Sequence, residues 1–236
     1  MQNVIFILTL SMLFMNITYA QGYTKDNTDK TCPSKVAYGD KTYNAVQIGA
    51  QCWFKENLNI GIMVDSLQHQ INNSTIEKYC YNNDTANCRM YGGLYQWNEA
   101  MQYSSAERAQ GICPTGWHIP SNGEFQTLQT TVNDLGGALK EVEQGMEKGI
   151  ATNTSGFSAI LSGYRTWNGM FDNAYFDKDY FDNGYTTNIG FNTSFWSSTE
   201  HGATGASNLL LYYKENSIAL YFSSKESGFS IRCLKD

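Results

Sequence analysis

The sequence predicts an α+β domain, in which two or three helices nearer the front of the chain precede a sheet nearer its end. Two observations support this class. A capped amphipathic helix follows Pro120, and strand-like segments joined by turn residues lie on either side of it. Helices and strands that fall into separate runs, rather than alternating, are typical of α+β domains.

The chain begins with the pattern of a secretory signal peptide. The almost unbroken apolar run over residues 4–14 is too short to cross a bilayer, which takes about 20 apolar residues. Thr18 and Ala20 place small residues at the −3 and −1 positions of a cleavage site. We therefore expect residues 1–20 to be removed and Gln21 to become the mature N-terminus. No Lys or Arg precedes the apolar run, and the alternative is a buried element of the core.

Polar and charged residues follow over positions 21–31 and predict a flexible leader. From residue 32 onward no linker, low-complexity tract or internal repeat interrupts the chain, so we expect residues 32–236 to form a single domain. No second apolar run is long enough to cross a membrane. These features predict an exported protein that is secreted, periplasmic or on the cell surface.

The charge balance argues against some partners. The net charge is −6, with only 16 Lys and Arg residues in the chain. Nucleic acid and anionic lipid are recognised through basic patches, so we expect neither as a partner. The abundant Tyr, Phe, Gly and Asn are typical of exported domains that face glycans or proteins, and also of ordinary Tyr-rich sheets.

Six cysteines in an exported chain indicate a disulfide framework, although six allow 15 connectivities. The pairs we expect are Cys32 with Cys52, Cys80 with Cys88, and Cys113 with Cys233. The first pair brackets a predicted hairpin, the second flanks a polar turn-forming segment, and the third is what remains. A zinc site is the alternative. It is disfavoured because no C-x₂-C pair occurs and the three His residues are scattered.

The front half predicts a hairpin and a short helix. Residues 36–38 and 43–48 read as strands, and Gly39 begins the turn between them. Apolar residues recurring at i, i+3 and i+7 predict a helix over residues 93–103.

The clearest helix follows Pro120. Ser121 is its N-cap and Glu124 stands three residues later, which is the pattern of a capping box. One apolar stripe then runs along the helix, and we expect it to end at Gly136. The stripe consists of Phe125, Leu128, Val132 and Leu135.

The last third of the chain predicts strands. Residues 209–213 and 218–222 flank the turn-forming segment 214–217 and predict a hairpin. Residues 229–233 predict the final strand, in which Cys233 would fix the end of the sheet to Cys113.

Five blocks of sequence resemble a known family, the Fibrobacter succinogenes major paralogous domain. They are VQIGAQCWFKENLN (46–59), YGGLYQW (91–97), GICPTGWHIP (111–120), FWSSTE (195–200) and GFSIRCLKD (228–236). The resemblance implies a C-type-lectin-like fold, with two or three helices packed on small antiparallel sheets, a long irregular loop and three disulfides. It also implies export from a bacterial cell, and it assigns no biochemical activity.

Relatives of this fold include the formylglycine-generating enzymes, which bind copper through two active-site cysteines near the C-terminal end. Here Cys233 alone lies in that region, and we expect it to pair with Cys113. The oxidase activity is therefore not carried over.

No catalytic motif appears in the sequence. G-x-S-x-G, H-E-x-x-H, P-loop and G-x-G-x-x-G patterns are all absent. His118 lies within a predicted strand, and we expect a hydrogen-bonded structural histidine rather than a catalytic base. The alternative functions are an enzyme acting on extracellular polysaccharide and a structural component of a surface assembly.

The segment 164–195 points to binding. It is rich in aromatic residues, Asp, Asn and Gly. It also occupies the place of the loop with which C-type-lectin-like domains bind their ligands. We expect a glycan or protein to bind over residues 164–226. The predicted ligand-binding residues are Tyr175, Tyr180, Tyr185, Trp196, Glu200, His201 and Tyr212. The alternative is that these rings pack the loop onto the core.

Calcium is a candidate cofactor. Asp177, Asp179 and Asp182 cluster around a turn, and calcium prefers oxygen ligands of this kind. The spacing is not that of an EF-hand, and the calcium motifs of lectins are absent. The alternative is a solvated acidic turn.

Domains with this kind of C-terminal region also occur as targets of diversity-generating retroelements, in which surface positions on a fixed sheet vary. The candidate display positions are His201, Thr204, Asn208, Leu210, Tyr212, Lys214, Asn216 and Tyr221. Alternation along the strand turns one set inward and the other outward, and the sequence leaves open which set is which.

Overall fold

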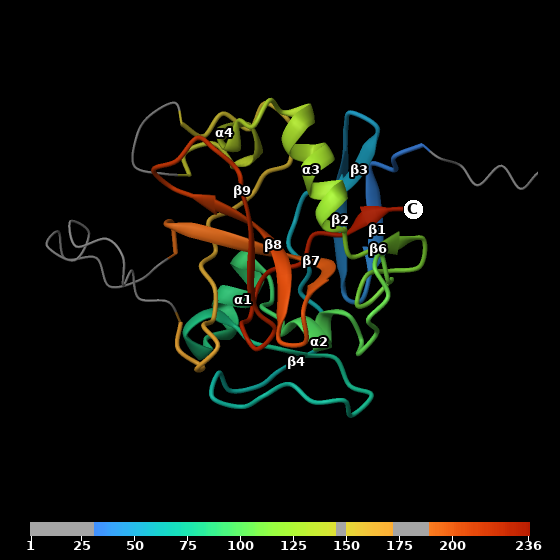
Figure 1. Cartoon of the computed structure of the whole chain (residues 1–236), viewed down its shortest axis with the longest axis vertical. Helices are drawn as coiled ribbons and strands as arrows, with labels where there is room; N and C mark the ends of the chain where they lie inside the picture. Colours follow the sequence, from blue (N-terminus) through green and yellow to red (C-terminus); the bar gives the residue numbers. More distant parts are fainter. Residues whose placement is uncertain (1–30, 145–149, 172–188) are drawn as a thin grey trace, which may run out of the picture. The chain divides into compact units, whose positions relative to one another are not determined.

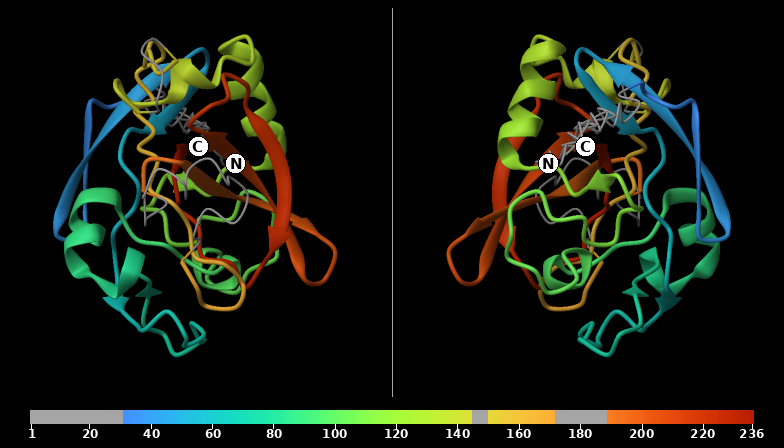
Figure 2. Two further views of the ribbon diagram at one scale, coloured as in Figure 1. Left: turned by 90° about the vertical axis from the view of Figure 1, so that its left-hand side faces the viewer. Right: turned by 90° about the vertical axis from the view of Figure 1, so that its right-hand side faces the viewer.

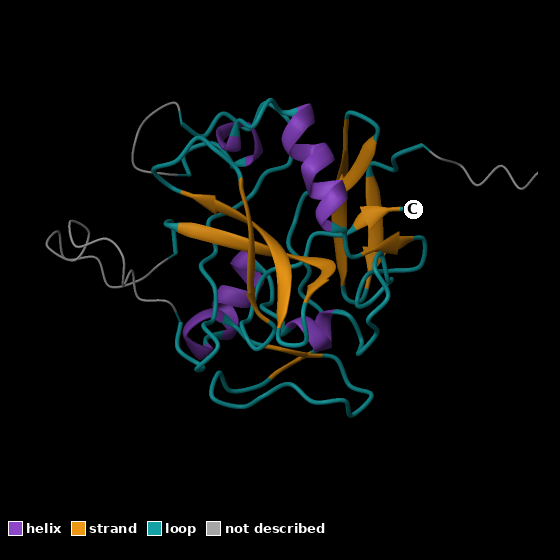
Figure 3. Cartoon of the chain, viewed as in Figure 1, coloured by secondary structure: helices purple, strands orange, loops and turns teal. Residues whose placement is uncertain are grey.

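Three β-sheets and four short α-helices make up residues 31–144, 150–171 and 189–236, the part of the chain that the computed structural model describes (Figures 1 and 3). The predicted α+β class is confirmed. Residues 32–236 group into one unit. The helical elements are η1 (Tyr81–Asn83, a 3₁₀ turn), α1 (Thr85–Tyr91), α2 (Trp97–Ala100), α3 (Asn122–Thr131) and α4 (Gly136–Leu139).

The largest sheet has five antiparallel strands in the order β1-β2-β3-β10-β6. They are β1 (Lys35–Tyr38), β2 (Lys41–Ile48), β3 (Gln51–Phe54), β6 (Trp117–His118) and β10 (Leu234–Lys235). The predicted front hairpin is confirmed as β1–β2. Its turn contains Gly39 at φ +58°, a left-handed conformation that glycine adopts without strain. β10, from the far end of the chain, lies between β3 and β6.

A second antiparallel sheet contains β7 (Asn192–His201), β8 (Gly205–Tyr212) and β9 (Ala219–Ser224), so the predicted second hairpin is confirmed as β8–β9. In the side views of Figure 2, β9 (red) and the β1–β2 hairpin (blue) lie on opposite sides of the unit.

The structure also shows which side chains of β8 point toward the core. Leu209 and Leu211 are fully buried, whereas Leu210 and Tyr212 are partly exposed. The third sheet pairs two short parallel strands, β4 (Ile62–Met63) and β5 (Glu77–Lys78).

α3 joins the two larger sheets. Its capping box is present, because the Ser121 hydroxyl accepts from the Glu124 amide while the Glu124 carboxylate accepts from the Ser121 amide. Phe125 is fully buried and its ring stacks on that of Trp53 in β3 at 5.6 Å. The prediction that Leu135 continues the stripe is wrong, since its side chain is 46% exposed. α3 ends at Thr131, and left-handed residues follow it and turn the chain away from the stripe.

Three other predictions need correction. The helix expected over 93–103 is limited to α2, because residues 94 and 95 form β-bridges with other segments and residues 102 and 103 are left-handed. The turn segment expected between Cys80 and Cys88 is instead η1 and the first turn of α1. Residues 229–233 form isolated bridges rather than a strand, and pairing resumes only at β10.

All three expected disulfides are present. Cys32 is bonded to Cys52, Cys80 to Cys88 and Cys113 to Cys233, and no cysteine among the described residues is free. The third bond spans 120 residues and ties the segment before β6 to the segment before β10.

Candidate functional site

Six of the predicted site residues lie outside the described part of the chain. They are the tyrosines Tyr175, Tyr180 and Tyr185 and the predicted calcium ligands Asp177, Asp179 and Asp182. Within the described ranges, no group of three or more His, Cys, Asp and Glu residues is placed to hold a metal ion.

Trp196, a predicted ligand-binding residue, lies in the core. Its side chain is fully buried, its indole N–H donates to the Tyr95 carbonyl at 2.8 Å, and its ring packs on Phe229 at 4.2 Å. A ligand at the surface does not reach this ring. The bulky apolar residue that suggested a binding platform instead joins β7 to the segment around Tyr95.

Glu200 is half-exposed and held in place by an ion pair. The Lys225 ammonium lies 2.6 Å from its Oε1 atom and also donates to the Ala203 carbonyl at 3.2 Å. The same ammonium lies 4.3 Å from the centroid of the Trp97 ring, a favourable cation–π contact. The carboxylate therefore has a fixed position at the end of β7.

A row of exposed rings begins at the next residue of β7, His201. The His201 ring stacks on Phe222 at 4.5 Å with a tilt of 29°, and Tyr221 stacks on Phe222 at 5.9 Å with a tilt of 14°. The side chains of Tyr221 and Phe222 are 64% and 57% exposed. We call these three residues the aromatic face. The sequence indicated His201 and Tyr221, but it gave no reason to single out Phe222.

The other candidate display positions fall into three groups according to their exposure. Asn208 is buried and donates to the Ser223 hydroxyl at 2.9 Å, so it does not face a ligand. Leu210 and the predicted ligand-binding Tyr212 are half-buried. The exposed positions are Thr204, Lys214 and Asn216, besides His201 and Tyr221.

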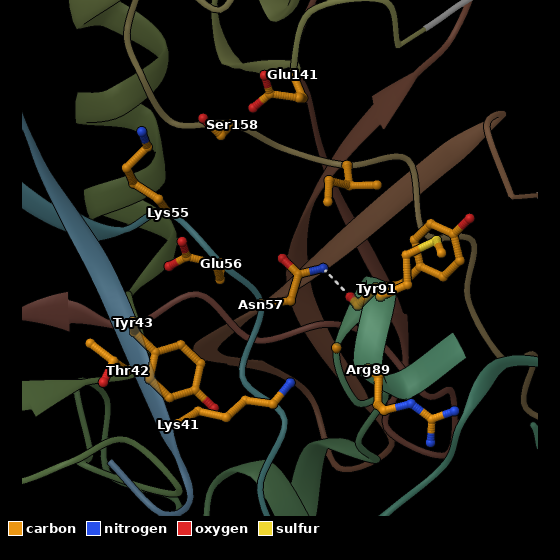
Figure 4. Close-up of a pocket in the computed structure, with 13 residues that line it drawn as sticks. Lys41, Thr42, Tyr43, Lys55, Glu56, Asn57, Arg89, Tyr91, Glu141 and Ser158 are labelled. Atoms are coloured by element: carbon orange, nitrogen blue, oxygen red, sulfur yellow. Dashed lines mark hydrogen bonds between the residues drawn. The ribbon is translucent and has the colours of Figure 1, made fainter. Parts of the chain in front are cut away.

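A pocket of about 440 Å³ lies between β2, the segment after β3, the end of α1 and the segment around residue 158 (Figure 4). We call it the β2–α1 pocket. Gly92 allows its walls to approach, because this residue has φ +88° and a Cβ atom there would lie 2.5 Å from Asn57 Cβ. The pocket is lined by Lys41, Thr42, Tyr43, Lys55, Glu56, Asn57, Arg89, Met90, Tyr91, Gly92, Glu141, Ser158 and Ile160.

The guanidinium of Arg232 is fully buried behind this pocket and donates hydrogen bonds to its walls. Its Nε donates to Asn57 Oδ1 at 2.6 Å, and its terminal nitrogens donate to the carbonyls of Phe54, Phe157 and Ser158 at 3.1, 2.6 and 2.9 Å. Burial lowers the pKa of Arg232 to about 9, while the charges of Glu56 and Glu141 act in the opposite direction. Asn57 in turn donates to the Tyr91 carbonyl, the bond drawn in Figure 4.

His118 is the structural histidine that we expected. It is buried in β6, with Nδ1 2.6 Å from Asp236 Oδ1 and Nε2 3.1 Å from Glu124 Oε1. Burial alone would raise the pKa of Glu124, but hydrogen bonds from His118 and Ser121 lower it to about 2. Arg108 also belongs to this cluster, because its Nε lies 3.0 Å from Glu124 Oε1. It links the start of α3 to the five-stranded sheet.

No helix among the described residues is long and apolar enough to cross a bilayer.

Comparison with known proteins finds no significant match among curated proteins or among solved structures. A family model does match, over residues 46–235, which contain the five blocks almost completely. Three of those blocks meet at the β2–α1 pocket, since they supply Asn57, Tyr91 and the buried Arg232. The chain belongs to the Fibrobacter succinogenes major domain family.

Proposed function

We propose that this protein is an exported binding module that recognises a glycan through the aromatic face, within the predicted 164–226 region. Residues 1–20 would serve as the signal peptide and residues 21–31 as a leader to the domain over 32–236. Three disulfides support export, because such bonds persist in oxidising compartments. The two antiparallel sheets with few helices support a C-type-lectin-like fold.

The observation that carries the proposal is the row of stacked, exposed rings. Large aromatic side chains usually contribute to the core, and exposing two of them beside a third leaves apolar surface in water. Here the side chains of Tyr221 and Phe222 are each more than half exposed although the fold has buried Phe195 and Trp196. Exposed rings of this kind indicate contact with a ligand.

The surroundings favour a glycan over a protein. Near-parallel rings offer apolar surface on which the C–H groups of a sugar can pack. The Glu200 carboxylate adjoins His201 in the sequence, is half-exposed, and is held by Lys225, so it can accept hydrogen bonds from sugar hydroxyls without first being ordered. A fixed acceptor and flat apolar surface near the same end of β7 match the alternating polar and apolar surface of a sugar.

The test is a glycan array with residues 21–236, followed by titration of any glycan that binds. We expect binding that is lost in the double variant Y221A/F222A and kept in L67A, which removes an equally exposed apolar side chain elsewhere. Equal binding by all three proteins would refute the proposal. Capture of a protein through the same two rings, with no glycan bound, would favour a protein partner. Cleavage of a labelled polysaccharide would favour the enzyme.

A further inference from the structure

The β2–α1 pocket carries positive charge that its own residues do not neutralise. Lys41, Lys55 and Arg89 line it, and no ion pair within the described residues joins any of the three to a carboxylate. The two carboxylates of the lining are already engaged. Glu56 accepts from the amide and the side chain of Asn44 at 2.7 and 2.6 Å, and Glu141 accepts from Asn153 at 3.2 Å.

The charge balance favours an anionic ligand. The cations of the lining and the guanidinium of Arg232 behind it outnumber the two carboxylates, four to two. The chain as a whole has a net charge of −6, so this local excess is opposite in sign to the rest of the molecule. A concave site with low-dielectric walls concentrates such a field and attracts ligands of the opposite charge.

The two carboxylates also restrict which anion fits. Glu56 and Glu141 repel a compact, multiply charged anion such as phosphate, but each can accept hydrogen bonds from hydroxyl groups. Thr42 and Ser158 add hydroxyls to the wall, and Tyr91 adds a ring. The volume of about 440 Å³ falls within the range of small-molecule sites, about 300–1,000 Å³.

We propose that the β2–α1 pocket binds a sugar acid, that is, a saccharide carrying a carboxylate. The carboxylate would lie beside Lys41 and Arg89, the sugar hydroxyls would donate to Glu56 and Glu141, and Lys55 would contact the part of the saccharide that lies beyond Asn57. Figure 4 shows Lys41 and Arg89 on one side of Asn57 and Lys55, Glu56, Glu141 and Ser158 on the other, so a ligand that contacts both groups has to extend past Asn57. Arg232 is a positioning residue, which holds both walls through their carbonyls and Asn57.

This site is independent of the aromatic face, which lies on β7 and β9. The experiment titrates residues 21–236 with digalacturonate, with its uncharged counterpart digalactose and with inorganic phosphate, by calorimetry. We expect digalacturonate to bind and the other two to bind at least about tenfold more weakly, because digalactose lacks the carboxylates that pair with the cations and phosphate is repelled by Glu56 and Glu141. Added salt should weaken the binding.

The variants locate the site. K41Q/K55Q should lose about tenfold or more in affinity for digalacturonate, because it removes two charged contacts to the ligand. K35Q, which removes an exposed lysine of β1 outside the pocket, and Y221A/F222A, which removes the aromatic face, should bind as the wild type does. Near-ultraviolet circular dichroism confirms that each variant is folded. Equal affinity for the acidic and uncharged disaccharides, tighter binding of phosphate, unchanged affinity in K41Q/K55Q, or no binding of digalacturonate would each overturn the proposal.

Discussion

The Nε atom of Arg232 donates a hydrogen bond of 2.6 Å to Oδ1 of Asn57, across 175 residues of sequence. Both side chains are buried, and the same guanidinium satisfies three backbone carbonyls. The segment around residue 232 is not paired as a strand, and the hydrogen bonds of this one charged group hold it in place instead. The guanidinium lies over the rings of Phe157 and Phe195, at 4.7 and 5.4 Å from their centroids.

Replacing Arg232 with Met should destabilise the domain by about 3–5 kcal/mol, because it leaves Asn57 and three carbonyls without their donor in the core. Lys should not rescue it, since an ammonium cannot reproduce the planar fork of donors. Guanidinium chloride unfolding measures both, and the exposed Arg89→Met variant, expected within about 0.5 kcal/mol of the wild type, is the control. A loss below 1 kcal/mol for Arg232→Met would contradict the role we assign to it.

The three disulfides should contribute unequally. In the chain-entropy model, the bond between Cys113 and Cys233, with a separation of 120 residues, contributes about 5 kcal/mol. The bond between Cys80 and Cys88, with a separation of 8, contributes about 2.5 kcal/mol. Paired Cys→Ala variants under non-reducing conditions should follow this order. The reverse order would show that native contacts, rather than loop closure, decide the contributions.

Stability should fall in acid in a way that depends on Glu124. Its pKa is lowered from an ordinary 4.5 to about 2, so its contribution is present above pH 4.5 and is lost as the pH falls toward 2. Glu124→Gln should therefore be less stable at neutral pH and lose less stability across that window. The exposed Asp40→Asn variant controls for changes in net charge. Parallel pH profiles for Glu124→Gln and the wild type would count against this role.

Truncation of Trp196 and of Phe222 should change the free energy of unfolding by very different amounts. Trp196→Ala should destabilise by about 3–5 kcal/mol, because it leaves a cavity in the core and removes one of the two hydrogen bonds to the Tyr95 carbonyl. Phe222→Ala should change the free energy of unfolding by less than about 1 kcal/mol, because the ring is 57% exposed. Chemical unfolding of both measures this contrast. A large loss for Phe222→Ala would mean that the aromatic face supports the fold rather than a ligand.

Export should remove the first 20 residues. Expressed with its own N-terminus in a bacterium, the protein should be recovered outside the cytoplasm with Gln21 as its first residue, because Thr18 and Ala20 fit the cleavage rule. N-terminal sequencing of the recovered protein decides this. Replacing Ala20 with a bulky residue should block cleavage, and a mature protein that still begins at Met1 would refute the signal peptide.

Local sequence patterns predicted what depends on near neighbours. The capping box at Ser121, the turn at Gly39 and the β8–β9 hairpin each follow from a few adjacent residues, and each is present. The disulfides could be predicted because loop signals bring two of the pairs together and leave one pairing for the rest.

Features that depend on distant contacts could not be predicted in this way. The helix expected from residue 93 fails because Tyr95 pairs with Phe229, far along the chain. The strand expected over 229–233 is limited to bridges because it changes partner from one residue to the next, with Phe229 paired to Tyr95 and Ser230 to Phe195 of β7. A lone arginine in a sequence gives no sign that it will be fully buried, and the β2–α1 pocket is assembled from segments up to about 120 residues apart, so no single stretch reveals it.

The place of β10 in the five-stranded sheet has a consequence for the order in which the protein can mature. A ribosome and an export channel both deliver the chain from its front, so β3 and β6 emerge long before the strand that lies between them. Until β10 arrives, the edges of both strands face solvent and Cys113 has no native partner. The five-stranded sheet therefore closes only after the chain has been released up to residue 235.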